Sequence, residues 1–133
     1  MTAAVYGLMR DGGDLLLMRR AGTGYRDGQL SLPAGHLGGA EDAVSGLVRE
    51  LAEELRIDAA PDGCHLALTM HRAPEESGDR EYLDLFFVVE GWRGTPTIGE
   101  PDKCSELVWV DQRHLPHGVV DYVAAALLAI DQG

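Results

Sequence analysis

GHLGGAEDAVSGLVRELAEELRI, residues 35–57, is the most informative segment of this sequence. Its later part has the spacing of an amphipathic helix, with the apolar residues Val44, Leu47, Val48, Leu51 and Leu55. Apolar residues at this spacing form one stripe that can pack against a sheet. Asp42 stands just before the stripe and suits an N-cap, because its carboxylate can accept from free backbone N–H groups. We therefore predict a helix over residues 42–55.

Three glutamates, Glu50, Glu53 and Glu54, share one face of this helix, since each residue turns the chain by about 100°. That face points away from the apolar stripe. Carboxylates this close repel one another, and a divalent cation that prefers hard oxygen ligands, Mg²⁺ or Mn²⁺, would relieve the repulsion. Ala43 and Gly46 project on the same side, so we expect their small size to leave room for phosphate groups and water.

Arg49 stands at the edge of the same face, where it can pair with a carboxylate and hold its rotamer. The alternative interpretation is a solvated acidic helix face, which is common in a chain with 22 acidic residues and 11 lysines and arginines. That alternative does not explain why Gly35, Glu41 and Arg49 stand at fixed offsets from the glutamates.

These offsets closely resemble the Nudix box, which reads Gly, five residues, Glu, seven residues, Arg-Glu, an apolar residue, any residue, Glu-Glu, any residue, Gly and an apolar residue. The charged or glycine positions that match are Gly35, Glu41, Arg49, Glu50, Glu53 and Glu54. The resemblance to the Nudix hydrolase family implies an α/β fold with a mixed β-sheet sandwiched between helices. It extends over nearly the whole chain, so we expect a single domain over residues 1–133.

The resemblance also implies roles for the matching residues. The implied ligands of Mg²⁺ or Mn²⁺ are the carbonyl of Gly35 and the carboxylates of Glu50, Glu53 and Glu54. Arg49 is expected to orient a glutamate and completes the catalytic set with these carboxylates. Glu41 is expected to support the helix and its neighbouring arginine.

The sequence departs from the box near its end, where Arg56 stands in place of glycine. Glycine permits a left-handed conformation at a helix C-terminus, and arginine adopts it at a cost of about 1 kcal/mol or more. Either Arg56 takes this conformation or the helix ends differently. Ala34 replaces a common glycine and Gly38 a common glutamate, which leaves the loop geometry and substrate preference open.

LPAGHL (residues 32–37) and EPDKC (residues 100–104) further resemble MutT-type nucleotide pyrophosphohydrolases. This resemblance implies hydrolysis of a phosphoanhydride bond in a nucleoside di- or triphosphate, or in a nucleoside diphosphate linked to another moiety. A water activated by the cation and a carboxylate base would attack one phosphorus. Glu50 is our first choice for the base. Some family members use a glutamate from a later loop, so Glu100 and Glu106 stay open.

Arg19 and Arg20 end the second predicted strand, and the family comparison places basic residues here near substrate phosphates. Alternation along a strand means that only one of them can face the site. His36 either contacts substrate or packs against its own turn. Trp92 and Trp109 could stack on a base, but Trp109 lies in an apolar strand, and we expect it in the core.

The remaining pattern is one of short strands, loops and a second helix. Strands are predicted over residues 5–9, 15–18, 66–70, 82–89 and 107–110, with a short one that stops at Pro33. Loops are predicted over residues 22–28, 61–63 and 91–103, with a polar connection over residues 75–80. The second helix is predicted over residues 119–130.

The composition limits the kinds of partner. The chain has 133 residues, 45% of them hydrophobic, and a formal net charge of −11. Such a charge opposes binding to nucleic acid polymers and anionic membranes, while a small nucleoside phosphate can be held through a cation. We expect a cytoplasmic protein, because no basic leader or apolar stretch of about 18 residues occurs, and reduced thiols at Cys64 and Cys104. A homodimer stays open.

Other functions compete with this interpretation. The fold could serve as a sensor that binds a nucleotide or nucleotide sugar without cleaving it, which the loss of a box carboxylate would favour; none is lost. A diphosphate hydrolase acting on an isoprenoid or inositol compound is another alternative, although an inositol pyrophosphate would need a more basic pocket. A purely structural protein would leave the glutamates unexplained.

Overall fold

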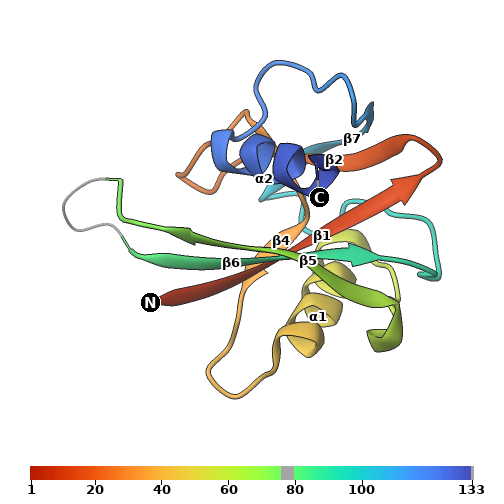
Figure 1. Ribbon diagram of the computed structural model, residues 1–133. Helices are drawn as coiled ribbons and strands as arrows, with labels where there is room; N and C mark the ends of the chain where they lie inside the picture. Colours follow the sequence, from red (N-terminus) through yellow and green to blue (C-terminus); the bar gives the residue numbers. More distant parts are fainter. Residues whose placement is uncertain (76–79, 133) are drawn as a thin grey trace.

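The computed structural model describes residues 1–75 and 80–132. Two helices lie on opposite sides of a mixed sheet, α1 (Ala43–Leu55) below it and α2 (Asp121–Gln132) above it in the view of Figure 1. A short 3₁₀ helix, η1 (Pro61–Gly63), follows α1. This arrangement confirms the predicted α/β architecture with helices on both faces of the sheet.

In the described residues the sheet has seven strands, and the longest of them, β1, lies at its centre. The strands are β1 (Thr2–Asp11), β2 (Asp14–Arg20), β3 (Leu30–Ser31), β4 (Ala34–His36), β5 (Cys64–Arg72), β6 (Tyr82–Val89) and β7 (Cys104–Asp111). β1 runs parallel to β6 and antiparallel to β4, while its last two residues pair with β2. β2 in turn pairs with β3 and β7. The sheet therefore divides at the end of β1 into two parts.

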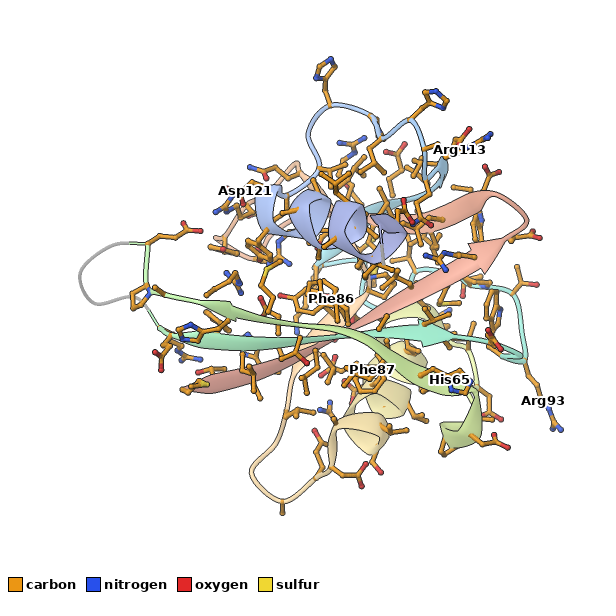
Figure 2. The ribbon with its side chains drawn as sticks, viewed as in Figure 1. His65, Phe86, Phe87, Arg93, Arg113 and Asp121 are labelled. Atoms are coloured by element: carbon orange, nitrogen blue, oxygen red, sulfur yellow. The ribbon has the colours of Figure 1, made fainter. Side chains whose placement is uncertain are left out.

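Alternation along the strands builds a separate apolar core on each side of the sheet. Phe86 and Phe87 are neighbours in β6, yet they point to opposite faces (Figure 2). Phe86 packs with Tyr6 and Leu8 in the cluster under α2, and Phe87 joins the cluster against α1. The predicted apolar stripe of α1 supplies three fully buried leucines to that second cluster: Leu47, Leu51 and Leu55.

Both ends of α1 are fixed by local hydrogen bonds. Asp42 is the N-cap, and its carboxylate accepts from the backbone N–H of Ser45 at 2.9 Å, as predicted. Arg56 ends the helix with φ 56° and ψ 37°, the left-handed conformation of the glycine that it replaces. The loop after β6 then covers the helix end, because the N–H groups of Thr97 and Gly99 donate to the carbonyls of Leu55 and Glu54. These bonds satisfy acceptors that a helix C-terminus leaves free.

The observed elements differ from the predicted ones at their ends. Most strands are longer than predicted, and β4 was not predicted because it follows Pro33 directly. α2 begins at Asp121 instead of residue 119, since Val119 forms an isolated bridge with Leu30. Four residues of the predicted polar connection, 76–79, lie outside the described residues.

The prediction that Trp109 lies in the core is wrong, because the residue is 40% exposed. Among the strands of the described residues, β7 pairs with β2 alone, so it forms an edge of the sheet. Its inward-facing residues are Val108 and Val110, which pack under α2. Alternation therefore turns Trp109 outward.

Two whole-chain expectations concern membranes and thiols. Among residues 1–75 and 80–132, neither helix is long and apolar enough to cross a membrane. Cys64 and Cys104 are free and buried, in the apolar cluster beside α1. Burial raises the pKa of both thiols, so they stay protonated at neutral pH.

Candidate active site

β4 places Gly35 directly against the first glutamate of the predicted site. Gly35 pairs with Val5 in the centre of the sheet. A Cβ atom at Gly35 would lie 2.0 Å from Cδ of Glu50 and 2.3 Å from its Oε1. No side chain fits in this space, so the glycine is required by the position of the carboxylate.

Glu54 lies one turn further along α1 and is also drawn into the protein. Its Oε1 accepts from the backbone N–H of Ala34 at 3.1 Å. Burial raises the pKa of Glu54 to about 8, and the nearby charge of Glu50 adds to this effect. Burial likewise raises the pKa of Glu50, whose side chain is 13% exposed. Two neighbouring carboxyl groups are thus removed from water without enough compensating charge.

Arg49 is the main cation beside these carboxylates. Its Nη1 donates to Oε1 of Glu50 at 2.9 Å and contacts the carboxylate of Glu53 at 3.3 Å. Its Nη2 donates to Oε1 of Glu41 at 2.6 Å. Glu41 also accepts from the N–H of Gly38, and the Arg49 hydrogen bond lowers the pKa of Glu41 to about 2. Arg49 therefore ties the loop before α1 to the glutamates on the helix.

The chemistry of these donors fits a hard divalent cation. Within the described part of the chain, no three His, Cys, Asp or Glu side chains converge closely enough to hold a metal ion as they stand. Glu50 and Glu53 turn toward Arg49 instead, and Glu54 turns toward Ala34. Carboxylate and carbonyl oxygens are nevertheless the ligands that Mg²⁺ and Mn²⁺ prefer, and the raised pKa of Glu54 marks negative charge that a cation would stabilise.

The two arginines at the end of β2 face opposite sides of the sheet. Arg19 follows Leu15 and Leu17 on the α2 side, where it pairs with Glu106 at 2.9 Å. Arg20 continues the row of Leu16 and Met18, which pack on the α1 side. Alternation therefore directs Arg20, and not Arg19, to the side on which α1 packs, although the register of β2 with β7 shifts between the two residues. The charge of Arg20 acts on both Glu54 and His36.

The electrostatics agree with this placement of Arg20. Burial and the charge of Glu50 raise the pKa of Glu54, while the N–H of Ala34 and the charge of Arg20 lower it. In the described residues, Arg20 forms no ion pair within 4.0 Å. Its charge is thus available to an anionic ligand.

The two candidate loop glutamates, Glu100 and Glu106, also lie on different sides of the sheet. Glu106 lies opposite Arg19 in the β2–β7 pairing and is held by it. Glu100 follows Gly99, whose N–H donates to the backbone carbonyl of Glu54 at 2.8 Å. Glu100 is close enough that its charge adds to burial in raising the pKa of Glu50 and Glu54. The structure therefore brings Glu100, and not Glu106, beside the α1 glutamates.

The small residues of α1 do not create space for substrate, contrary to the prediction. A Cβ at Gly46 would lie 2.4 Å from Cδ2 of Leu37 and 3.1 Å from Oε1 of Glu41. Gly46 is buried, and Ala43 packs against the apolar cluster on this side of the sheet. Their size instead lets the loop before α1 approach the helix.

His36 extends from the site toward the α2 side of the molecule. Its ring lies 5.6 Å from the ring of Tyr82, and its backbone carbonyl accepts from Arg49 at 3.3 Å. Partial burial and the charges of Arg80 and Arg72 lower the pKa of His36, so the ring is neutral at pH 7. It neither packs only against its own turn nor contacts a glutamate of α1.

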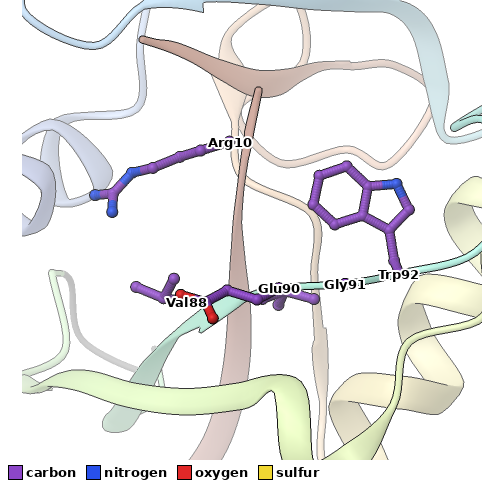
Figure 3. Close-up of a pocket in the computed structure, with 6 residues that line it drawn as sticks. Arg10, Val88, Glu90, Gly91 and Trp92 are labelled. Carbon is purple, nitrogen blue, oxygen red and sulfur yellow. The ribbon is translucent and has the colours of Figure 1, made fainter. Parts of the chain in front are cut away.

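Two surface cavities lie away from these residues. One, of about 440 Å³, is lined by Arg10, Trp92 and the end of β6 (Figure 3). The other, of about 380 Å³, lies between the end of β5 and α2, beside Arg72 and Tyr122. Of the predicted site residues in the described chain, Trp92 lines the first of these cavities, while the α1 glutamates, Gly35, Arg49 and Arg20 line neither.

Solved structures of similar fold place this geometry in a known context. The MutT NUDIX hydrolase from Burkholderia pseudomallei is similar with a TM-score of 0.86 and 22% identity, over 96% of this chain and 95% of that one. The MutT protein from Methanosarcina mazei Go1 gives 0.83 and 20%, over 98% and 93%. A bifunctional NMN adenylyltransferase/ADP ribose pyrophosphatase from Francisella tularensis gives 0.69 and 18%, over 98% of this chain and 40% of that one. At these identities the likeness concerns the fold.

A search among curated proteins found no match. The profile of the NUDIX domain, by contrast, matches residues 1–127. This match covers nearly the whole chain and includes every residue of the site described above. The chain therefore belongs to the NUDIX domain family, the Nudix hydrolases.

Proposed function

We propose that this protein is a pyrophosphohydrolase that needs Mg²⁺ or Mn²⁺ and cleaves a phosphoanhydride bond in a nucleoside phosphate. The substrate class is a nucleoside di- or triphosphate, or a nucleoside diphosphate linked to another moiety. The observation that carries the proposal is the pair of desolvated carboxyl groups, Glu50 and Glu54, held beside the backbone of Gly35. A solvated acidic helix face would not raise the pKa of a glutamate to about 8.

The proposed cation ligands are the carbonyl of Gly35 and the carboxylates of Glu50, Glu53 and Glu54. When bound, the cation would neutralise charge on phosphate oxygens and favour deprotonation of a water nucleophile. One of the similar solved structures is the Francisella tularensis bifunctional protein complexed with AMP and a Mn ion, at 20% identity. A Mn ion and a nucleotide are thus ligands of a protein in which a similar fold makes up 42% of the chain.

Arg49 is proposed as the residue that orients the glutamates. Its contacts with Glu41, Glu50 and Glu53 hold it across the start of the site. Arg20 is proposed to bind a substrate phosphate, because it faces the glutamates and has no carboxylate partner in the described chain. His36 is proposed to contact substrate at the α2-side edge of the site, because its backbone carbonyl accepts from Arg49 and its neutral ring can donate or accept a hydrogen bond.

Glu50 is proposed as the base, with Glu100 as the alternative. Glu50 is held by a helix and by Arg49, so its carboxylate keeps its place without substrate. Glu100 lies in a loop that is fixed to the end of α1 and could complete the site when substrate binds. Glu106 is engaged by Arg19 on the other face and serves as a matched control.

The function is tested by incubating the protein with nucleoside di- and triphosphates, nucleotide sugars and dinucleoside polyphosphates in Mg²⁺. Released phosphate and pyrophosphate are quantified with and without excess chelator. We expect turnover of at least one compound and its loss in chelator. Full turnover in chelator would contradict the metal site, and tight binding of a nucleotide with no turnover would favour the sensor.

The base is tested by titrating Mg²⁺ against initial rate for Glu50→Gln, Glu100→Gln and Glu106→Gln. We expect Glu50→Gln to weaken the response to Mg²⁺ and slow turnover together, and Glu106→Gln to resemble the wild type. If Glu100→Gln lost most turnover at unchanged Mg²⁺ response while Glu50→Gln kept substantial turnover, the base would be Glu100.

A further inference from the structure

The loop of residues 21–28, between β2 and β3, contains an arginine in an unusual conformation. Arg26 has φ 54°, in the left-handed region that residues with a Cβ seldom adopt. It is one of two such non-glycine residues in the described chain, and the other, Arg56, is the helix cap. Contacts of the Arg26 side chain must therefore hold this conformation in place.

Those contacts join the loop to two distant segments. The guanidinium of Arg26 pairs with Glu75 at 2.5 Å, just after β5, and with Asp121 at 3.0 Å, at the start of α2. It also lies 5.4 Å from the ring of Tyr25 and 5.6 Å from the ring of Tyr122. The side chain of Arg26 is only 18% exposed as a result. Asp121 is seen at the beginning of α2 in Figure 2, on the side of this loop.

The same loop holds Arg20, the cation on the side of the glutamates. Nε of Arg20 donates to the backbone carbonyl of Tyr25 at 2.8 Å, and its Nη2 donates to Oγ1 of Thr23 at 3.2 Å. The guanidinium also lies 5.5 Å from the ring of Tyr25. Thr23 is fixed in turn by Asp27. The position of Arg20 thus depends on the backbone immediately before Arg26.

We propose that Arg26 is a positioning residue that acts through this loop to hold Arg20 ready for a substrate phosphate. The inference rests on the proposed function, because it takes Arg20 to be the phosphate-binding cation. The Arg26 side chain pairs with Glu75 and Asp121 and contacts no residue of the proposed cation site on α1. Without the Arg26 side chain, Arg20 would keep its positive charge, but its side chain would be free to take other rotamers.

The test replaces Arg26 by glycine, which tolerates the backbone conformation and removes every side-chain contact. We measure KM and kcat with the best substrate of the panel, and calorimetric Kd for the α,β-methylene analogues of ATP and GTP in Mg²⁺. We expect KM and Kd to rise on the order of tenfold, in the range of couplings between interacting residues, with kcat nearly unchanged. Arg26→Lys, which keeps the charge, should recover part of the affinity.

Arg56→Gly is the matched control, because it makes the same substitution at the other left-handed arginine. It should leave KM, kcat and Kd unchanged. A double-mutant cycle with Arg20→Ala then identifies the route of the effect. If Arg26 acts through Arg20, the Arg26→Gly substitution will change KM and Kd little once Arg20 is already alanine.

Three results would overturn the proposal. One is an unchanged KM and Kd in Arg26→Gly, and another is a fall in kcat alone. The third is an undiminished effect of Arg26→Gly in the Arg20→Ala background. A failure of the proposed function would look different, because the wild type would bind the analogues without turning over any substrate. In that case the analogue Kd values of the double-mutant cycle would still decide the role of Arg26.

Discussion

Gly35 and Glu50 are in such close contact that the Glu50 carboxyl group occupies the space where a side chain of residue 35 would begin. The glycine is not needed for its backbone freedom, since its φ is not positive. It is needed because the Glu50 carboxyl group fills the space where a Cβ would be. The effects of substituting Gly35 should therefore appear in the chemistry of Glu50 before they appear in the fold.

Gly35→Ala should move the carboxylate of Glu50 and reduce turnover. A displacement of about 1 Å at a reacting group can cost on the order of 100-fold in rate, and we expect a loss of this size in kcat. Initial rates at saturating Mg²⁺ and substrate measure it, with circular dichroism to verify the fold. Gly39→Ala is the control, because nothing lies within 4 Å of a Cβ there. Equal rates for the two variants would contradict the role of the Gly35 contact.

Glu54 should make the stability of the metal-free protein depend on pH. Its pKa in the folded protein, about 8, lies above the ordinary value of 4.5, because burial and Glu50 disfavour the charged form. The folded state therefore holds this proton more tightly than the unfolded state does. Its contribution to stability is complete below the ordinary pKa and is lost as the pH rises through about 8.

We expect the melting temperature in chelator to fall between about pH 5 and about pH 9, and Glu54→Gln to flatten that fall. Thermal melts of both proteins over this range give the measurement. The variant should also be more stable than the wild type at the alkaline end. Parallel curves for the two proteins would show that Glu54 is not desolvated as described.

The α1 helix is fixed at both ends and carries the glutamates of the site between them. Asp42 caps its start, and the loop between β6 and β7 donates N–H groups to its last carbonyls. Glycine is required at position 99 in this loop, since a Cβ there would lie 2.1 Å from the carbonyl oxygen of Glu53. The same packing brings Glu100 next to the helix. The end of α1 and the loop thus form one unit.

Arg56→Gly should stabilise the protein, because the helix ends in a left-handed conformation that arginine adopts at a cost. We expect the free energy of unfolding to rise by about 1 kcal/mol, the penalty for a residue with a Cβ in this region. Urea denaturation in chelator measures the change. An unchanged or lower stability would mean that the Arg56 side chain makes contributions that outweigh the strain.

A buried ion pair joins the edge of the sheet to α2 and so links both ends of the chain. Asp84 is completely buried in β6 and pairs with Arg72 of β5. The guanidinium of Arg72 lies 3.7 Å from the ring of Tyr122 and 4.5 Å from that of Tyr82. Tyr6 also donates its hydroxyl to Asp84. Groups from β1, β5, β6 and α2 therefore meet at one charged cluster inside the core under α2.

Arg72→Met should destabilise the fold strongly, because it leaves the buried Asp84 carboxylate without its partner. Removing one member of a buried pair costs about 3–5 kcal/mol, and we expect a loss in this range on urea denaturation. Arg113→Met serves as the control. Its side chain is 81% exposed and pairs with Asp111 at the surface, where such pairs contribute less than about 1 kcal/mol. A loss for Arg72→Met as small as that of the control would contradict the burial of the pair.

Much of this protein could be predicted from short stretches of its sequence. The apolar stripe and Asp42 predict α1 within one residue, and Tyr82 to Val89 predicts β6, because local spacing and capping determine these elements. The offsets from Gly35 to Glu54 predict which carboxylates share one helix face. They also predict the pairing of Arg49 with its neighbours, since Glu50 and Glu53 are within reach on the same helix.

Contacts between distant segments decided the rest. Alternation alone shows that Arg19 and Arg20 face opposite sides, but only the pairing of β2 with β7 and the packing of α1 show that Arg20 faces the glutamates. The same contacts place Glu100 at the site and Glu106 away from it. The α1 helix and its carboxylate donors follow from local sequence, because they depend on residues within a few positions of one another. Which arginine and which loop glutamate join them follows from the three-dimensional packing, because strand pairing and burial depend on residues far apart in the chain.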